Sequence, residues 1–119
     1  MRCRRFIGSL RMAALAASLL FAHPASAETR ALLIGVSDYE AEDAGLADLR
    51  GPANDVRLLR DVLAERGVTD IRVLADGVEG GTRPTRAAIL AAFADLAATA
   101  AEGDFVYIHL SGHGTRQVD

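Results

Sequence analysis

The sequence DFVYIHLSGHG, residues Asp104–Gly114, joins a buried-strand pattern to an abrupt turn. Its first part, Phe105–Leu110, is rich in aromatic and β-branched residues and predicts a strand buried on both faces. Two glycines then flank His113, and they allow a sharp turn and close approach of the backbone. His113 is therefore expected just past the carboxyl end of a core strand, where open α/β sheets bind their ligands.

The chain before this stretch is expected to contain two more strands and two helices. Apolar runs at residues 30–36 and 70–74 predict the strands. Pro52 favours a helix start because proline is preferred at the first helical position, and Gly67 is placed to end that helix. A second helix is expected to follow Thr85, a residue type that caps helix N-termini.

Apolar residues at three- and four-residue spacing mark the faces that these helices should bury. In the first helix they are Val56, Leu59, Val62 and Leu63, and in the second they are Ile89, Phe93, Leu96 and Ala100. The order strand, helix, strand, helix, strand implies an α/β fold. Such a fold has a parallel sheet with right-handed crossovers and helices on its faces.

Residues 1–27 have the pattern of a secretory signal peptide. Four arginines precede or border the short apolar segment Met12–Ala22, Pro24 follows it, and Ala25–Ala27 offers a small-residue cleavage site. We therefore expect an exported protein, periplasmic or extracellular, whose mature domain is residues 28–119. The alternatives are an uncleaved membrane anchor and a misassigned start codon. The pattern does not separate the general secretory route from the twin-arginine route.

The composition of the mature domain narrows its range of partners. All 16 acidic residues lie in it, whereas four of the 13 basic residues lie in the leader, so the domain is acidic. An acidic domain without a basic stripe argues against nucleic acid and anionic membranes as partners, and it is compatible with a cationic substrate. Cys3 is the only cysteine, so the mature domain has no disulfide, thiolate metal ligand or cysteine nucleophile of its own.

His113 taken alone is a weak indicator, since most loop histidines have no catalytic role. His109, four residues earlier, is in phase with Phe105 and Tyr107 and is expected to be half-buried with a hydrogen-bond partner. On a strand and turn the two histidines do not face one metal ion, so no metal site is expected. The chain has no G-x-G-x-x-G or Walker A motif, so no nucleotide or other cofactor is expected.

Four segments, in this order, resemble one peptidase family. They are RALLIGVSDY (30–39), LRGPANDVRLLRDVL (49–63), PTRAAILAAF (84–93) and GDFVYIHLSGHG (103–114). Together they are similar to the amino-terminal half of the caspase-like cysteine peptidases (peptidase C14, clan CD), especially the metacaspase and bacterial branch. The resemblance implies a three-layer caspase-like sandwich with a mainly parallel sheet. Residues 28–119 would be a partial, p20-type domain that ends after the third strand.

The resemblance also implies roles for individual residues. His113 matches the base that takes the proton of the catalytic cysteine, and Gly114 matches the residue whose backbone N–H helps to form the oxyanion hole. Asp55, expected in the first turn of its helix, matches the acid of the S1 pocket that pairs with a substrate Arg or Lys. Ser111 matches a position lining the same cleft. Family members often have cysteine where Pro52 stands, so this position departs from the metacaspase pattern.

The family's cysteine nucleophile would follow a later strand, about 50 residues beyond the histidine, whereas this sequence ends at Asp119. We therefore expect the N-terminal part of an exported endopeptidase that cleaves peptide or protein substrates after Arg or Lys, inactive in this form. Three strands would leave the third uncovered on one side, which invites self-association through the sheet edge. The alternative is a non-catalytic pseudo-peptidase that acts as an interaction module.

Overall fold

The computed structural model describes residues 26–39 and 45–114. Its elements, in chain order, are β1 (Thr29–Gly35), α1 (Gly51–Glu65), β2 (Asp70–Ala75), α2 (Arg86–Thr99) and β3 (Phe105–Ser111). This order confirms the predicted alternation of strands and helices. The predicted signal peptide, residues 1–27, lies outside the described residues except for its last two. No helix in the described ranges is long and apolar enough to cross a membrane.

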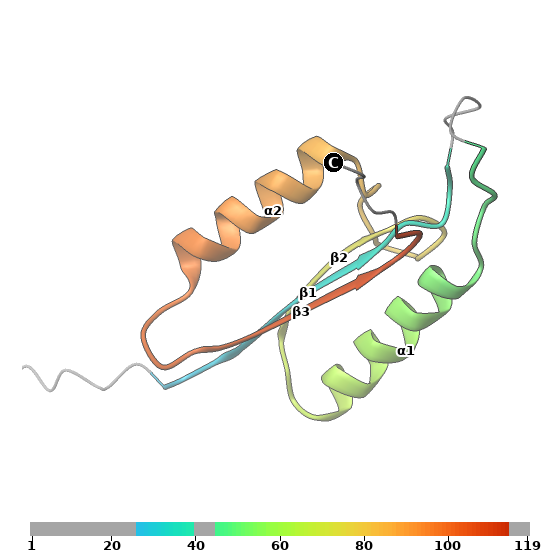
Figure 1. The fold of residues 1–119 in the computed structure, drawn as a ribbon. Coiled ribbons are helices and arrows are strands. Elements are labelled where there is room, and N and C mark those ends of the chain that lie inside the picture. The colour runs from blue at the N-terminus through green and yellow to red at the C-terminus, as the bar shows by residue number, and fades with distance from the viewer. Residues whose placement is uncertain (1–25, 40–44, 115–119) are drawn as a thin grey trace, which may run out of the picture.

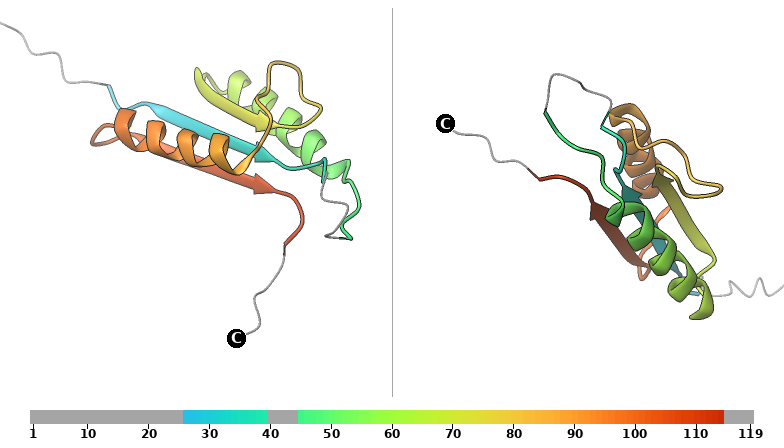
Figure 2. Two further views of the ribbon diagram at one scale, coloured as in Figure 1. Left: turned by 90° about the horizontal axis from the view of Figure 1, so that it is seen from above. Right: turned by 90° about the vertical axis from the view of Figure 1, so that its right-hand side faces the viewer.

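The three strands form one parallel sheet in the order β2-β1-β3. Gly35, at the end of β1, is in register with Ala75 of β2 and with Ser111 of β3. Helix α1 lies on one face of the sheet and α2 on the other, as Figures 1 and 2 show. The predicted α/β class, with three layers and a parallel sheet, is confirmed for the described part of the chain.

The central strand β1 contributes to the apolar core on both faces of the sheet. Residues 31–35 are all buried, and because successive strand side chains point to opposite faces, they divide between the two helices. Ala31 and Leu33 pack with Val56 on the α1 side. Leu32 and Ile34 pack with Leu74 of β2 and Leu96 of α2 on the other side.

The prediction that β3 is buried on both faces is wrong. Phe105 and Leu110 are 64% and 65% exposed, and Val106 and Ile108 are also exposed. The reason is the strand order: among the described residues β3 pairs with β1 alone, and the apolar cluster under α2 draws its strand residues from β1 and β2. Among the β3 residues, only Tyr107, which faces α1, packs against an apolar core cluster. The expectation that the third strand would be uncovered on one side is therefore confirmed.

The helix ends follow the residues that predicted them. Pro52 lies in the first turn of α1, and Gly67 follows its end with a φ of +84°, a conformation that favours glycine. Thr85 caps α2, its side chain accepting a hydrogen bond from the backbone N–H of Ala88. The predicted inner face of α2 needs correction at Phe93, which is exposed. The helix residues packed on the sheet are Ala88, Ile89, Ala92 and Leu96.

Helix α1 begins very close to the end of β1. A Cβ atom at Gly35 would lie 2.8 Å from Val56 Cγ2 and 2.9 Å from the carbonyl oxygen of Pro52. The missing side chain at Gly35 therefore lets the first turns of α1 lie directly on the strand. This contact brings the start of α1 to the carboxyl edge of the sheet.

An ion-pair network joins the amino ends of the three strands. Arg30 of β1 pairs with Asp70 of β2 and with Asp104, which precedes β3, each at 2.7 Å, and with Glu28 at 3.0 Å. The Asp104 side chain is 4% exposed. The backbone N–H of Ala101, then Arg30 and the backbone N–H of Glu28, lower the pKa of Asp104 to about 2. The same carboxylates, Asp104 first, raise the pKa of Arg30.

Replacing Asp104 by Asn is expected to destabilise the protein at neutral pH, and the loss is expected to vanish in acid. Because the folded pKa of about 2 lies below the ordinary value of 3.8, the ionised carboxylate stabilises the fold fully above about pH 4, and this contribution is lost as the pH falls towards 2. Urea unfolding midpoints measured from pH 7 to pH 2 test this. Glu102→Gln, an exposed change in the same turn, is the control. A constant difference between wild type and Asp104→Asn across this range would contradict the prediction.

Candidate active site

The candidate site lies at the carboxyl edge of the sheet. Because all three strands are parallel, the segments that follow them meet at this edge. The segment after β1 leads to α1, and the segment after β3 is Gly112–Gly114. The predicted location of His113, just past the end of β3, is confirmed.

His113 is exposed, and two residues between β1 and α1, Tyr39 and Ala47, contact it. Its backbone N–H donates a hydrogen bond to Tyr39 Oη at 2.7 Å, and its ring lies edge-on to the Tyr39 ring with centroids 4.7 Å apart. Its Nε2 atom lies 2.8 Å from the carbonyl oxygen of Ala47. A carbonyl oxygen only accepts, so Nε2 is the donor and carries the proton. In the neutral ring the lone pair is then on Nδ1, which can act as a base.

The structure brings together two of the other predicted residues. Ser111, at the end of β3, donates its Oγ hydrogen bond to Asp55 Oδ2 at 2.8 Å, across 56 positions of sequence. Asp55 is the fifth residue of α1, so the expectation of a first-turn position is wrong. Its carboxylate is exposed and held at the sheet edge by the hydroxyl.

Gly114 follows His113 directly and is exposed. A Cβ atom built at this position meets no atom of the described residues within 4 Å. Within that part of the chain, space is open beside its backbone for an incoming group.

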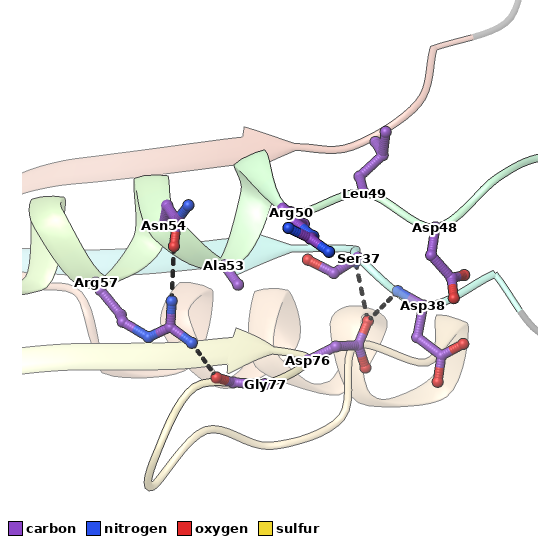
Figure 3. Close-up of a pocket in the computed structure, with 10 residues that line it drawn as sticks. All are labelled: Ser37, Asp38, Asp48, Leu49, Arg50, Ala53, Asn54, Arg57, Asp76 and Gly77. Atoms are coloured by element: carbon purple, nitrogen blue, oxygen red, sulfur yellow. Dashed lines mark hydrogen bonds between the residues drawn. The ribbon is translucent and has the colours of Figure 1, made fainter.

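A pocket of about 450 Å³ lies along the same edge, between α1 and the ends of β1 and β2. Asp76 closes one side of it and accepts hydrogen bonds from the backbone N–H groups of Ser37 and Asp38 at 3.0 and 3.1 Å. Arg57 crosses it to bond Asn54 and the carbonyl of Gly77, as Figure 3 shows. None of the four predicted site residues lines this pocket. Its polar side chains largely bond one another or the adjoining backbone.

Two further results concern metal and histidine chemistry. No group of three His, Cys, Asp or Glu side chains within residues 26–39 and 45–114 is arranged to hold a metal ion. His109 is half-buried, as expected, and lies on the α1-facing side of β3. Its Nε2 atom, however, is buried and has no hydrogen-bond partner in the described ranges, so the expected partner of that atom is not found.

The sequence prediction missed Tyr39 and Ala47, which contact His113 from 74 and 66 positions away. Tyr39 lies three residues after the predicted strand 30–36. This position, at the predicted carboxyl edge of the sheet, was the only sequence feature that could have indicated a role for it. The Ala47 contact is made by a backbone carbonyl, which any residue type supplies.

Residues 29–119 match the family described as "Metacaspase, peptidase C14 domain". The chain belongs to the metacaspase family. It is 43% identical over 90 residues to metacaspase-4 of Arabidopsis thaliana, a match that covers 73% of this chain and 21% of that protein. It is 40% identical over 90 residues to metacaspase-6 of the same plant, covering 73% and 23%.

A third relative comes from a trypanosome. The chain is 40% identical over 92 residues to a Trypanosoma brucei brucei protein named inactive metacaspase-4, covering 73% of this chain and 25% of that protein. The chain thus spans about a fifth to a quarter of the length of these relatives. The roles of His113, Gly114, Asp55 and Ser111 in this metacaspase stay predictions.

Proposed function

We propose that this chain is the N-terminal part of an exported metacaspase endopeptidase that cleaves peptide bonds after Arg or Lys. His113 is its general base. The catalytic cysteine comes from polypeptide outside residues 28–119, because these hold no cysteine, and the chain alone is therefore inactive. The observation that carries this proposal is an exposed imidazole whose Nε2 donates to Ala47, so that Nδ1 holds the lone pair, at the carboxyl edge of a metacaspase sheet.

The proposed reaction follows from the tautomer of His113, with the proton on Nε2 and the lone pair on Nδ1. Nδ1 takes the proton of the cysteine thiol, and the thiolate attacks the scissile carbonyl carbon. The carbonyl oxygen becomes an oxyanion, which the backbone N–H of Gly114 stabilises. The imidazolium then gives its proton to the leaving amine, and water, activated by the same histidine, hydrolyses the thioester. Whenever the ring is neutral, the hydrogen bond from Nε2 to the Ala47 carbonyl favours the Nε2-protonated tautomer, so Nδ1 is the atom that takes and gives the proton.

Specificity for basic residues is supported by the Asp55–Ser111 pair. The Ser111 hydroxyl holds one carboxylate oxygen of Asp55 on the same sheet edge as His113. The other oxygen is left to accept hydrogen bonds from a guanidinium or ammonium group, the strongest kind that a carboxylate makes. The acidic balance of the mature domain also favours cationic substrates.

Export is supported by the sequence of residues 1–27. Its charged start, short apolar segment and small-residue end are those of a cleaved signal peptide. The proposed location is periplasmic or extracellular.

Fluorogenic peptides that end in Arg, Lys or Asp test the proposal in the protein encoded by the complete reading frame. Arg and Lys substrates are expected to be cleaved at least about 100-fold faster than the Asp substrate, because only basic side chains pair with Asp55. The sequence beyond residue 119 is expected to hold the cysteine at the end of a strand. A complete frame without this cysteine would overturn the peptidase proposal and favour the pseudo-peptidase.

A further inference from the structure

We propose that Tyr39 is a positioning residue for His113, holding the imidazole in the orientation that a base for the cysteine requires. This inference rests on the proposed function. Among the described residues, Tyr39 is the only side chain that either hydrogen-bonds to His113 or stacks against its ring.

Tyr39 acts on both the backbone and the ring of His113. Its Oη accepts the His113 N–H at 2.7 Å, which fixes the path of the chain directly after β3. Its ring lies at 62° to the imidazole at 4.7 Å, a favourable edge-to-face contact that restricts rotation of the histidine side chain. Because His113 is otherwise exposed, these contacts limit the positions that its Nδ1 atom reaches.

Tyr39 is itself held by a hydrogen bond of its own backbone and by one of the nearby Ser37. Its backbone N–H donates to Asp48 Oδ1 at 3.0 Å. The neighbouring Ser37 carbonyl accepts from the N–H of Leu49 at 2.8 Å. These bonds tie residues 37–39 to residues 48 and 49, next to Ala47, whose carbonyl accepts from His113 Nε2. The two joined stretches hold the backbone of His113 through Tyr39 and its ring through Ala47.

The glycine before His113 is explained by the same contact. A Cβ atom at Gly112 would lie 2.8 Å from Tyr39 Oη, closer than real Cβ atoms approach. The next nearest atoms, in Val36, would be at 3.4 Å, an ordinary contact distance. The tyrosine hydroxyl is thus the atom that a side chain at this position would displace.

Catalysis depends on this placement because a general base must lie within hydrogen-bond reach of its proton. A displacement of about 1 Å costs on the order of 100-fold in rate. In the complete peptidase, Tyr39→Phe is therefore expected to lower kcat about 10-fold with KM unchanged, and Tyr39→Ala about 100-fold. The matched control is Tyr107→Phe, which removes the hydroxyl of the chain's other tyrosine. Tyr107 lies on β3 and its hydroxyl makes no hydrogen bond within the described ranges, so kcat should not change.

A second set of measurements does not depend on turnover. Hydrogen exchange of the His113 amide is expected to be faster in Tyr39→Phe than in wild type, because the amide loses its acceptor, and unchanged in Tyr107→Phe. Gly112→Ala is expected to lower kcat as Tyr39→Phe does. The double variant should lose less than the product of the two single effects, since removing the hydroxyl relieves the clash. This coupling tests the contact between the hydroxyl and position 112, and the loss in kcat with KM unchanged tests the placement of His113.

The outcomes separate this inference from the proposed function. If Tyr39→Phe matches Tyr107→Phe in kcat, the positioning role is overturned while the peptidase stands. If the complete wild-type protein cleaves nothing, the proposed function is overturned, and amide exchange alone decides whether Tyr39 holds His113. Equal exchange rates in Tyr39→Phe and wild type would then overturn the contact itself.

Discussion

In the complete peptidase, His113→Ala is expected to lower kcat/KM for an Arg substrate by about 10⁴-fold or more, because a nucleophile and its base act as a unit and removing either one removes most of the rate enhancement. Without the imidazole the thiol stays largely protonated near neutral pH, and the leaving amine has no proton donor. Initial rates with the fluorogenic Arg peptide measure the loss.

The control for this variant is His109→Gln. His109 lies on β3, in the same short stretch of chain, but on the strand itself and half-buried on the α1 side. Its replacement is expected to leave the rate within a few fold, provided circular dichroism confirms that the variant folds. A His113→Ala protein that keeps more than about a tenth of the wild-type activity would show that another group is the base.

Asp55→Asn is expected to lower kcat/KM for Arg and Lys substrates by about 100-fold. The amide has nearly the volume of the carboxylate and still offers an oxygen to the Ser111 hydroxyl, so the change removes mainly the charge. Losing one partner of a desolvated, hydrogen-bonded charge pair costs about 2–5 kcal/mol, and each 1.4 kcal/mol is a factor of about ten. Michaelis–Menten constants for Arg, Lys and uncharged peptides measure the effect.

Asp61→Asn provides the matched control, because Asp61 is an exposed acid farther along α1 whose only ion pair among the described residues is a 3.4 Å contact with its neighbour Arg60. It should leave all three substrates unchanged. If Asp55→Asn slows charged and uncharged peptides equally, Asp55 serves the structure rather than the choice of substrate. A selective loss for basic peptides would support the proposed S1 role.

The elements of this fold are largely encoded by short-range signals. Pro52, Gly67 and Thr85 mark helix ends through the conformations and hydrogen bonds that those residue types favour, and the structure has them at those ends. The apolar runs became β1, β2 and β3 for the same local reason. Strand and helix alternation then leaves few topologies, so the parallel sheet also followed from the sequence.

The local sequence patterns did not predict how deeply each strand is buried. Runs 30–36 and 105–110 are both mostly apolar, yet β1 is the buried centre of the described sheet and β3 an exposed edge of it. Strand order decides this difference, and order depends on contacts between segments far apart in sequence. The face of α2 was also ambiguous, because an alanine-rich helix offers small residues on every side. Packing selected Ala88 and Ala92 and left Phe93 exposed.

The sequence by itself determined the element types, the parallel α/β class, the place of His113 after the last strand and the family resemblance, because each depends on neighbouring residues or on motifs in order. Only the tertiary structure decided what surrounds that histidine. Tyr39 and Ala47 reach it across more than 60 positions, and Ser111 reaches Asp55 across 56. These contacts exist because parallel strands bring the loops after them to one edge, and local pattern carries no record of which loop residues then meet.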